Sequence, residues 1–201
     1  MAAPQRKRDP QATRARILTA AKKLMSDGDG EFEMSWVAKA AGVSQGLAYH
    51  YFGSKEGLLS AVVEDFYDRV ESSVLMARLP EYDDWSRRER DRVARYLEFL
   101  LADPLSRRVI TQLAGTPAVA SVEARRWERL IDEGARNIAE GQSLGVITAP
   151  LESRLLAAMV LGAVRAAVTT ELSEDSGVDP EALADEIWRF VGGGLGLETG
   201  T

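Results

Sequence analysis

The strongest structural signal in this sequence is the stretch AGVSQGLAYHYFGSKEGLL, residues 41–59. Apolar residues within 34–41 predict a short helix, which Gly42 then breaks. Ser44 is a favourable N-cap for a second short helix over residues 45–51. Two short helices joined by a turn of three or four residues that contains glycine indicate a helix-turn-helix.

Two longer helices flank this motif. Apolar residues recur at helical spacing from near Gln11 until Gly28 and Gly30, which predicts one helix before the motif. After the motif, Ser54 can cap a helix whose apolar stripe reaches towards Leu75. A helix of that length, at roughly 1.5 Å per residue, spans about 38 Å, which is enough to tie a small N-terminal domain to the rest of the chain.

The remainder of the chain also has helical periodicity, and no segment alternates strictly between apolar and polar residues. Further helices are indicated within residues 93–101, 105–113, 127–138, 155–168 and 183–191. We therefore predict an all-α protein of about nine helices without a sheet.

Composition excludes several kinds of chemistry. The 201 residues include no Cys and a single His, so disulfides, thiolate nucleophiles and thiolate or multi-histidine metal sites are not expected. The chain has neither an apolar run long enough for a transmembrane helix nor an apolar stretch after its basic N-terminus. We expect a cytoplasmic protein that is not an enzyme, with no catalytic residue, no metal and no cofactor.

The formal net charge of −6 hides an asymmetry along the chain. Residues 1–55 contain nine Lys or Arg against five Asp or Glu, whereas the remaining residues contain 16 against 26. A basic module on an acidic body suits a protein that meets phosphates at one end. A solvated surface of cations explains the same counts, so charge alone leaves both interpretations open.

The second helix of the motif carries side chains suited to reading DNA. Gln45 can pair with adenine, Gly46 allows the backbone to approach closely, and Leu47 can contact a thymine methyl group. Tyr49 lies one turn after Gln45, so we expect its ring to pack and its hydroxyl to reach DNA, whereas Phe52 is expected in the core. The groups expected to hold phosphates are Ser44, His50, Tyr51 and Lys55.

These residues resemble the helix-turn-helix of the TetR family of transcriptional regulators. The resemblance runs from Ile17 to Leu59 and rests on Val37-Ala38, Ala41-Gly42-Val43-Ser44, Gly46, Tyr49, Tyr51-Phe52, Ser54-Lys55-Glu56 and Leu58-Leu59. It implies a homodimer with an N-terminal DNA-binding domain of three helices and a helical C-terminal domain that binds a small effector. It also implies that the fourth helix links the two domains.

The resemblance sets the expected domain organisation. We expect a helix-turn-helix DNA-binding domain over residues 1–54 and an effector-binding and dimerisation domain over residues 55–201. Residues 1–10 are expected to form a flexible arm, and whether its basic side chains enter the minor groove or are simply disordered stays open. These side chains are Arg6, Lys7 and Arg8.

The sequence departs from the family pattern at three places. Glu33 stands where the family usually has a Ser or Thr that caps the second helix, and a carboxylate cannot donate to a phosphate. Leu47 and Ala48 replace a more usual Thr-Leu pair, which removes a hydroxyl from the reading face. Gly53 replaces a common Pro, which is expected to loosen the joint between the third and fourth helices.

The acidic part of the chain holds more aromatic side chains than a dimer seam requires, so some of them are expected to line an effector pocket. Plain core packing is the competing interpretation for each one. Arg165 lies in an otherwise apolar helix, which suggests an apolar effector with an acidic group. The pocket candidates are Phe66, Val70, Tyr96, Leu100, Trp127, Ile131, Met159 and Arg165.

Two further stretches have informative patterns. The run from Arg87 to Arg95 is interpreted as a solvated helix face with a pair between Asp91 and Arg95. The tail WRFVGGGLGLE, residues 188–198, is similar to the ends of TetR-type regulators connected with lipid metabolism in high-GC bacteria.

Two helices near the C-terminus present small and branched residues that allow close approach of helices. Two copies of such a pair can form a four-helix seam, so a symmetric dimer and an approximately palindromic operator are expected. The seam candidates are Leu156, Val160, Ala163, Val164, Ala167, Ile187 and Val191.

We therefore expect a TetR-type regulator, a repressor released from a palindromic DNA operator by a small, apolar effector. An activating or effector-independent regulator, an all-helical enzyme or ligand carrier, and a helical scaffold stand as alternatives. Salt-dependent binding to duplex DNA separates a regulator from the carrier, the enzyme and the scaffold, because counterion release gives a steep slope.

Overall fold

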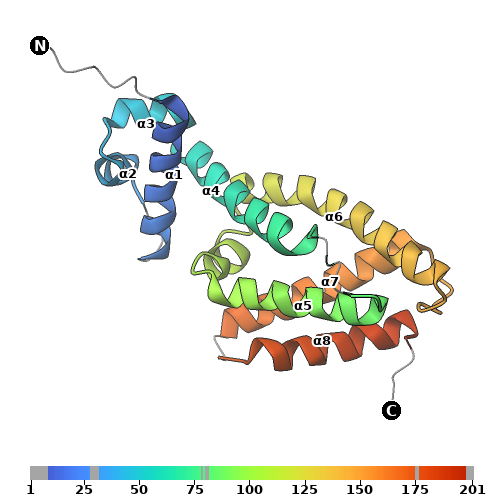
Figure 1. Ribbon diagram of the computed structural model, residues 1–201. Coiled ribbons are helices and arrows are strands. Elements are labelled where there is room, and N and C mark those ends of the chain that lie inside the picture. The colour runs from blue at the N-terminus through green and yellow to red at the C-terminus, as the bar shows by residue number, and fades with distance from the viewer. Residues whose placement is uncertain (1–8, 28–31, 78, 80–81, 175–176, 198–201) are drawn as a thin grey trace, which may run out of the picture. The chain divides into compact units, whose positions relative to one another are not determined.

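The computed structural model describes residues 9–27, 32–77, 79, 82–174 and 177–197 (Figure 1). Within these ranges every regular element is helical, as the prediction of an all-α protein requires. The elements are α1 (Pro10–Ser26), α2 (Met34–Ala41), α3 (Gln45–Phe52), α4 (Lys55–Val70), η1 (Glu71–Leu75), α5 (Trp85–Ala102), η2 (Arg108–Gln112), α6 (Pro117–Ser143), α7 (Ser153–Glu174) and α8 (Pro180–Leu195).

The segments η1 and η2 are π-helical. Because η1 continues α4 and η2 is separate, the described residues form nine helices, so the predicted number is confirmed. The helix that starts at Lys55 reaches Leu75, where its apolar stripe was expected to end. The basic residues 6–8 of the predicted arm lie outside the described residues.

Local signals explain where the helices of the motif begin and end. Ser44 Oγ accepts a hydrogen bond from the backbone N–H of Leu47 at 3.2 Å, and Ser54 Oγ accepts one from Gly57 at 3.0 Å. Both predicted N-caps are therefore confirmed. Gly42 ends α2 in the left-handed conformation, with a φ of 64°, which few other residues adopt without strain.

The chain divides into two compact units, and the first ends at Phe66. In this unit α2 packs against both α1 and α3. The apolar stripes of α1 and α4 supply much of its core, and Phe52 is buried as the sequence predicts. The fully or nearly fully buried residues include Ile17, Ala21, Met25, Phe32, Met34, Val37, Ala48, Leu58 and Val62.

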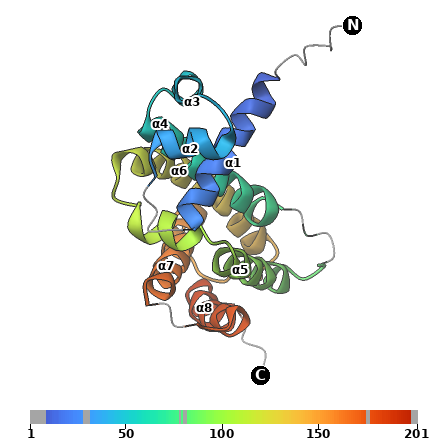
Figure 2. The same ribbon diagram turned by 90° about the vertical axis from the view of Figure 1, so that its left-hand side faces the viewer.

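The second unit begins at Tyr67 and contains η1, α5, η2 and α6 to α8. Helix α6 packs along α7, and α8 lies beside both α5 and α7 (Figures 1 and 2). The first turns of α5 and α8 are capped by carboxylates, since Asp84 accepts from the N–H of Arg87 and Asp179 accepts from that of Ala182. This helical bundle contains the cavity described below.

Candidate functional site

Helix α3 presents one polar face and one buried face. Ala48 and Phe52 are buried, whereas Gln45 and Tyr49 are exposed one turn apart. Gly46 and His50 are also exposed, and Leu47 and Tyr51 are half-buried. The side chains proposed to read bases are thus available on the surface of the first unit, and Ser44, at the N-cap, stays exposed beside them.

The joint between α3 and α4 depends on glycine. Gly53 has a φ of 74°, which the ring of a proline cannot adopt, so this chain has a different turn from one built around the usual Pro. A Cβ on Gly57 would lie 2.1 Å from the carbonyl oxygen of Phe52, so only glycine fits there. The guanidinium of Arg14 lies 5.0 Å from the ring centroid of Phe52 and helps to hold the end of α3.

Lys55, a predicted phosphate ligand, is paired with a carboxylate of its own unit. Its Nζ donates to Oε1 of Glu33 at 2.9 Å, with 43% and 58% of the two side chains exposed. The same ammonium lies 5.5 Å from the ring centroid of Phe32. Glu33 makes no side-chain cap to α2, so the departure from the family pattern exchanges a helix cap for an ion pair with Lys55.

One exposed aromatic residue of the first unit was missed by the sequence analysis. Trp36 on α2 is 53% exposed, and the neighbouring Ser35 and Lys39 are exposed as well. Trp36 falls off the buried stripe formed by Met34, Val37 and Ala38, and this mismatch with the helical period was the available signal. Trp36 therefore adds an exposed aromatic side chain to the surface of the first unit.

The second unit contains a cavity of about 880 Å³. Its walls come from the end of α4, from η1 and the segment after it, and from α5, η2, α6, α7 and α8. Of the eight pocket candidates, Tyr96, Trp127 and Arg165 line this cavity. Four others are buried in the core but are absent from its lining, namely Phe66, Val70, Leu100 and Ile131. Met159 is 56% exposed on the surface of α7.

The charged side chains in the cavity wall neutralise one another. Five Arg and four Glu line the cavity, and every one of them forms an ion pair with a described residue. The pairs are Arg88 with Glu89 and Glu140, Arg92 with Glu89, Arg126 with Asp68 and Glu71, Arg136 with Glu133, and Arg165 with Glu123. Apolar side chains and paired charges therefore form the walls.

One part of the cavity wall contains a chain of polar groups. The Tyr67 hydroxyl donates to Glu123 at 2.5 Å, and the Arg165 guanidinium donates to the other oxygen of Glu123 at 2.8 Å. Arg165 also lies 5.5 Å from the ring centroid of Trp127. Burial and the hydrogen bond to Glu123 raise the pKa of Tyr67, and burial raises the pKa of Tyr96 to about 12. Both phenols are therefore neutral at physiological pH.

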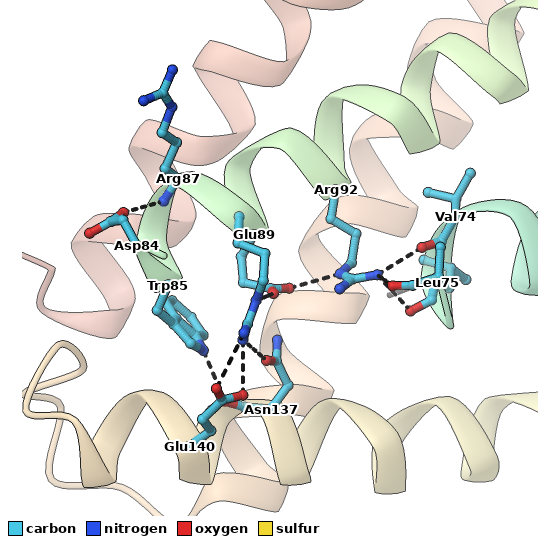
Figure 3. A network of polar contacts seen from close by, with 11 residues as sticks. Val74, Leu75, Asp84, Trp85, Arg87, Glu89, Arg92, Asn137 and Glu140 are labelled. Atoms are coloured by element: carbon cyan, nitrogen blue, oxygen red, sulfur yellow. Dashed lines mark hydrogen bonds and ion pairs between the residues drawn. The ribbon is translucent and has the colours of Figure 1, made fainter. Parts of the chain in front are cut away.

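A second polar network in the cavity wall centres on α5, and it corrects the interpretation of the run from Arg87 to Arg95 (Figure 3). Arg92 donates to Glu89 and to the carbonyl oxygens of Val74, Leu75 and Ala77 at 2.8, 3.1 and 2.9 Å. Arg92 therefore fastens the C-terminal end of η1, and Ala77 after it, to α5. Glu89 is buried, so the interpretation of this run as a solvated face was wrong for these residues.

The same network fastens α5 to α6. Arg88 donates to Glu89, to the side chain of Asn137 at 2.9 Å and to Glu140, and the hydrogen bonds from Arg88 lower the pKa of Glu140. The expected pair of Asp91 and Arg95 is present on α5, with 2.6 Å between its nitrogen and oxygen atoms. The missed signal is the spacing from Trp85 through Arg88, Glu89 and Arg92 to Tyr96, which is one helix face.

The seam candidates on α7 and α8 separate into two groups. The side chains that the protomer already buries are Leu156, Val164, Ile187 and Val191. Val160 lines the cavity, as Val164 and Val191 also do, and Ala163 and Ala167 are half-buried. Large apolar side chains on the outside of these helices are Leu155, Met159 and Phe190, and Phe190 is 74% exposed. By length and composition alone, α7 could also cross a membrane.

The exposed helix α3 follows a turn that contains glycine, and a helical bundle with a large cavity comes after it. This arrangement is typical of helix-turn-helix regulators that bind DNA. Residues 17–62 match the family described as "Bacterial regulatory proteins, tetR family". This match covers the helix-turn-helix and, together with the relatives below, supports a TetR family transcriptional regulator.

Individual relatives agree with this assignment. The fatty acid metabolism regulator protein of Bacillus subtilis (strain 168) is 27% identical over 190 residues, which is 89% of this chain and 93% of the relative. A putative TetR-family regulator from Syntrophomonas wolfei has a TM-score of 0.74 at 20% identity, covering 96% of this chain and 100% of that one. The regulator FadR from B. subtilis, in complex with stearoyl-CoA, has a TM-score of 0.71 at 22% identity, covering 90% and 98%. The two structures show a shared fold.

Proposed function

We propose that this protein is a cytoplasmic repressor that binds a palindromic operator as a homodimer and releases it when an apolar ligand fills the cavity. The observation that carries the proposal is one continuous helix. It runs from Lys55, a proposed phosphate contact, to Leu75, which lines the cavity together with Tyr67. The same helix therefore belongs to the DNA-binding unit and to the cavity wall.

The DNA-binding role rests on α3. Gln45, Gly46, Leu47 and Tyr49 are proposed to face base edges in the major groove, because they lie at the start and on the outer side of the helix. Ser44, His50, Tyr51 and Lys55 are proposed to hold phosphates. Lys55 exchanges Glu33 for a phosphate when DNA binds, so the ion pair opposes binding.

The dimer is proposed to form through the outer faces of α7 and α8. Leu155, Met159 and Ala163 follow one another at intervals of four residues, which places them on one stripe of α7. Phe190 on α8 is largely exposed in the single chain. An apolar surface of this kind marks an interaction site, and a second copy would cover it with an identical stripe. The seam candidates that are buried within the protomer then pack behind this apolar surface and hold α7 and α8 in place.

A long acyl chain is the ligand type that the comparisons support. The relative from B. subtilis is named for fatty acid metabolism, and the structural neighbour FadR was crystallised with stearoyl-CoA. A cavity of about 880 Å³ lies in the usual range for sites that enclose a small molecule, roughly 300 to 1,000 Å³. Its apolar walls suit a hydrocarbon chain.

Release is proposed to act through the helix formed by α4 and η1. The end of η1 is held by Arg92, which lies in the cavity wall, so a ligand that moves this part of the wall also moves the end of the helix. The π-helical geometry of η1 is a local departure from regular α-helix of the kind found at functional sites. By thermodynamic linkage, ligand and DNA then weaken each other's binding by the same factor.

The proposal is tested by selecting bound sequences from random duplexes with the purified full-length chain. The selected operator should be an approximate palindrome with half-sites about 34 to 36 Å apart. Fluorescence anisotropy on this operator should then show release by long-chain acyl compounds. A protein that selects no sequence and binds duplex DNA without a salt dependence is no DNA-binding regulator. A selected operator from which no such compound releases the protein points to an effector-independent regulator.

A further inference from the structure

We infer that the cavity selects ligands whose buried polar group is uncharged, such as a hydroxyl or an ester carbonyl, and discriminates against free carboxylates. The inference rests on the proposed function in one respect only, because it takes the cavity to be the ligand site. The sequence suggested a ligand with an acidic group that pairs with Arg165. The structure instead indicates that the polar group of the ligand inside the cavity is uncharged.

The charge balance of the wall is the first reason. Each cation that lines the cavity already has a carboxylate partner among the described residues, so none is left to neutralise an incoming anion. A carboxylate that enters such a site loses its hydration. It meets no unpaired positive charge that would compensate for this loss. An uncharged group has a much smaller desolvation cost.

The geometry around Glu123 is the second reason. One oxygen accepts from Tyr67 at 2.5 Å and the other accepts from Arg165 at 2.8 Å, and the Glu123 side chain is 11% exposed. A ligand carboxylate at Arg165 would lie beside this buried carboxylate and repel it. If Arg165 turned to the ligand instead, it would leave Glu123 buried without its counter-ion, which costs more than a lost surface pair.

Tyr96 supplies the partner for a neutral group. It lines the cavity near Glu123 and Arg165, and it makes no hydrogen bond to any residue that the structure describes. A phenol can donate to a carbonyl oxygen or both donate to and accept from an alcohol. A single neutral donor in an apolar wall orients a ligand without adding charge.

The experiment compares three probes of equal chain length, namely dodecanol, methyl dodecanoate and sodium dodecanoate. Binding to the full-length protein is measured by calorimetry at neutral pH, where the acid is ionised, and release of operator DNA is measured separately. We expect the alcohol and the ester to bind at least about tenfold more tightly than the acid, because the acid buries an unpaired charge. Equal or tighter binding of dodecanoate to the wild-type protein overturns the inference.

Glu123→Gln provides the sharper test, because it removes the anion that competes for Arg165. We expect the affinity for dodecanoate to rise about tenfold or more, while the affinity for dodecanol changes little. Glu128→Gln is the matched control, since Glu128 also lies on α6 and also pairs with an arginine of α7, Arg154, but does not line the cavity. This control should keep the wild-type order of ligands. An unchanged preference in Glu123→Gln overturns the role of Glu123.

Tyr96→Phe keeps the inference testable if Glu123→Gln does not fold. The loss of one hydrogen bond should weaken dodecanol binding by about two- to tenfold and leave dodecanoate unaffected. Neutral ligands that bind in the expected order but never release DNA support the selectivity and overturn the proposed regulation. If the acid releases DNA in preference to the alcohol, the proposed regulation is supported and the proposed selectivity is overturned. If none of the three probes binds, both proposals fall.

Discussion

The substitution Glu33→Gln is expected to tighten operator binding. In the free protein, Glu33 holds the ammonium of Lys55 at 2.9 Å, and DNA has to displace this carboxylate before Lys55 can reach a phosphate. An exposed ion pair of this kind contributes about 0.2 to 1 kcal/mol. Glutamine keeps the size of the side chain and removes its charge, so the competition for Lys55 disappears.

The size of the effect follows from the symmetry of the proposed dimer. Two such pairs oppose binding by about 0.4 to 2 kcal/mol, which corresponds to a gain of about 2- to 30-fold in operator affinity. The dependence on salt should also become steeper, by up to about 0.9 per protomer in the logarithmic slope, because Lys55 would displace counterions from a phosphate without freeing a carboxylate.

The measurement is fluorescence anisotropy with the selected operator at salt concentrations from about 50 to about 200 mM. Glu98→Gln is the control, since Glu98 is an exposed carboxylate of α5 and its loss changes the net charge equally. Lys55→Ala should weaken binding more in the Glu33→Gln background than in the wild type, and this double-mutant cycle isolates the pair. If Glu33→Gln melts like the wild type yet binds operator no more tightly and with the same slope, Lys55 is not a phosphate contact.

Three further predictions concern base reading, assembly and ionisation. Gln45→Ala should relax base preference at one position of each half-site, at a cost of about 1 to 3 kcal/mol there, and a repeated sequence selection that returns the same consensus would contradict it. Met159→Glu combined with Phe190→Glu should give a folded monomer by analytical ultracentrifugation with much weaker operator binding, and a persistent dimer would rule out this face. In an alkaline titration followed by phenolate absorbance, Tyr67 and Tyr96 should ionise above the usual tyrosine pKa of about 10, Tyr96 near about 12. Because their folded pKa values are raised, the stability that they contribute is present below the unfolded value of about 10 and is lost as the pH rises above it.

The helix-turn-helix could be predicted because its signals are local. Ser44 caps a backbone N–H three residues away, and Gly42 adopts a positive φ that depends on its own lack of a side chain. The same holds for Ser54 and for the burial of Phe52, which follows from the apolar period. No partner from a distant part of the chain is needed to specify these features.

The lining of the cavity could not be predicted from periodicity. Phe66 and Tyr67 are neighbours in α4, but only Tyr67 lines the cavity. Both are aromatic, so their residue types give no indication of which one meets the space between helices. Ile131 and Leu130 on α6 show the same difference, since Leu130 lines the cavity and Ile131 is buried away from it. Small rotations of each helix, set by its packing partners, decide the outcome.

The sequence by itself determined the helical class, the helix ends of the helix-turn-helix and the family resemblance, because these depend on caps, glycines and apolar spacing within a few residues. Only the tertiary structure decided which charges are paired. Glu33 meets Lys55 across 22 residues, and Arg165 meets Glu123 across 42. Arg88 and Glu89 look like solvated charges until Asn137 and Glu140 of α6 are placed beside them. Ion pairs between distant segments depend on how whole helices pack. In this protein the packing pairs the charged side chains of the cavity wall, so their charges cancel.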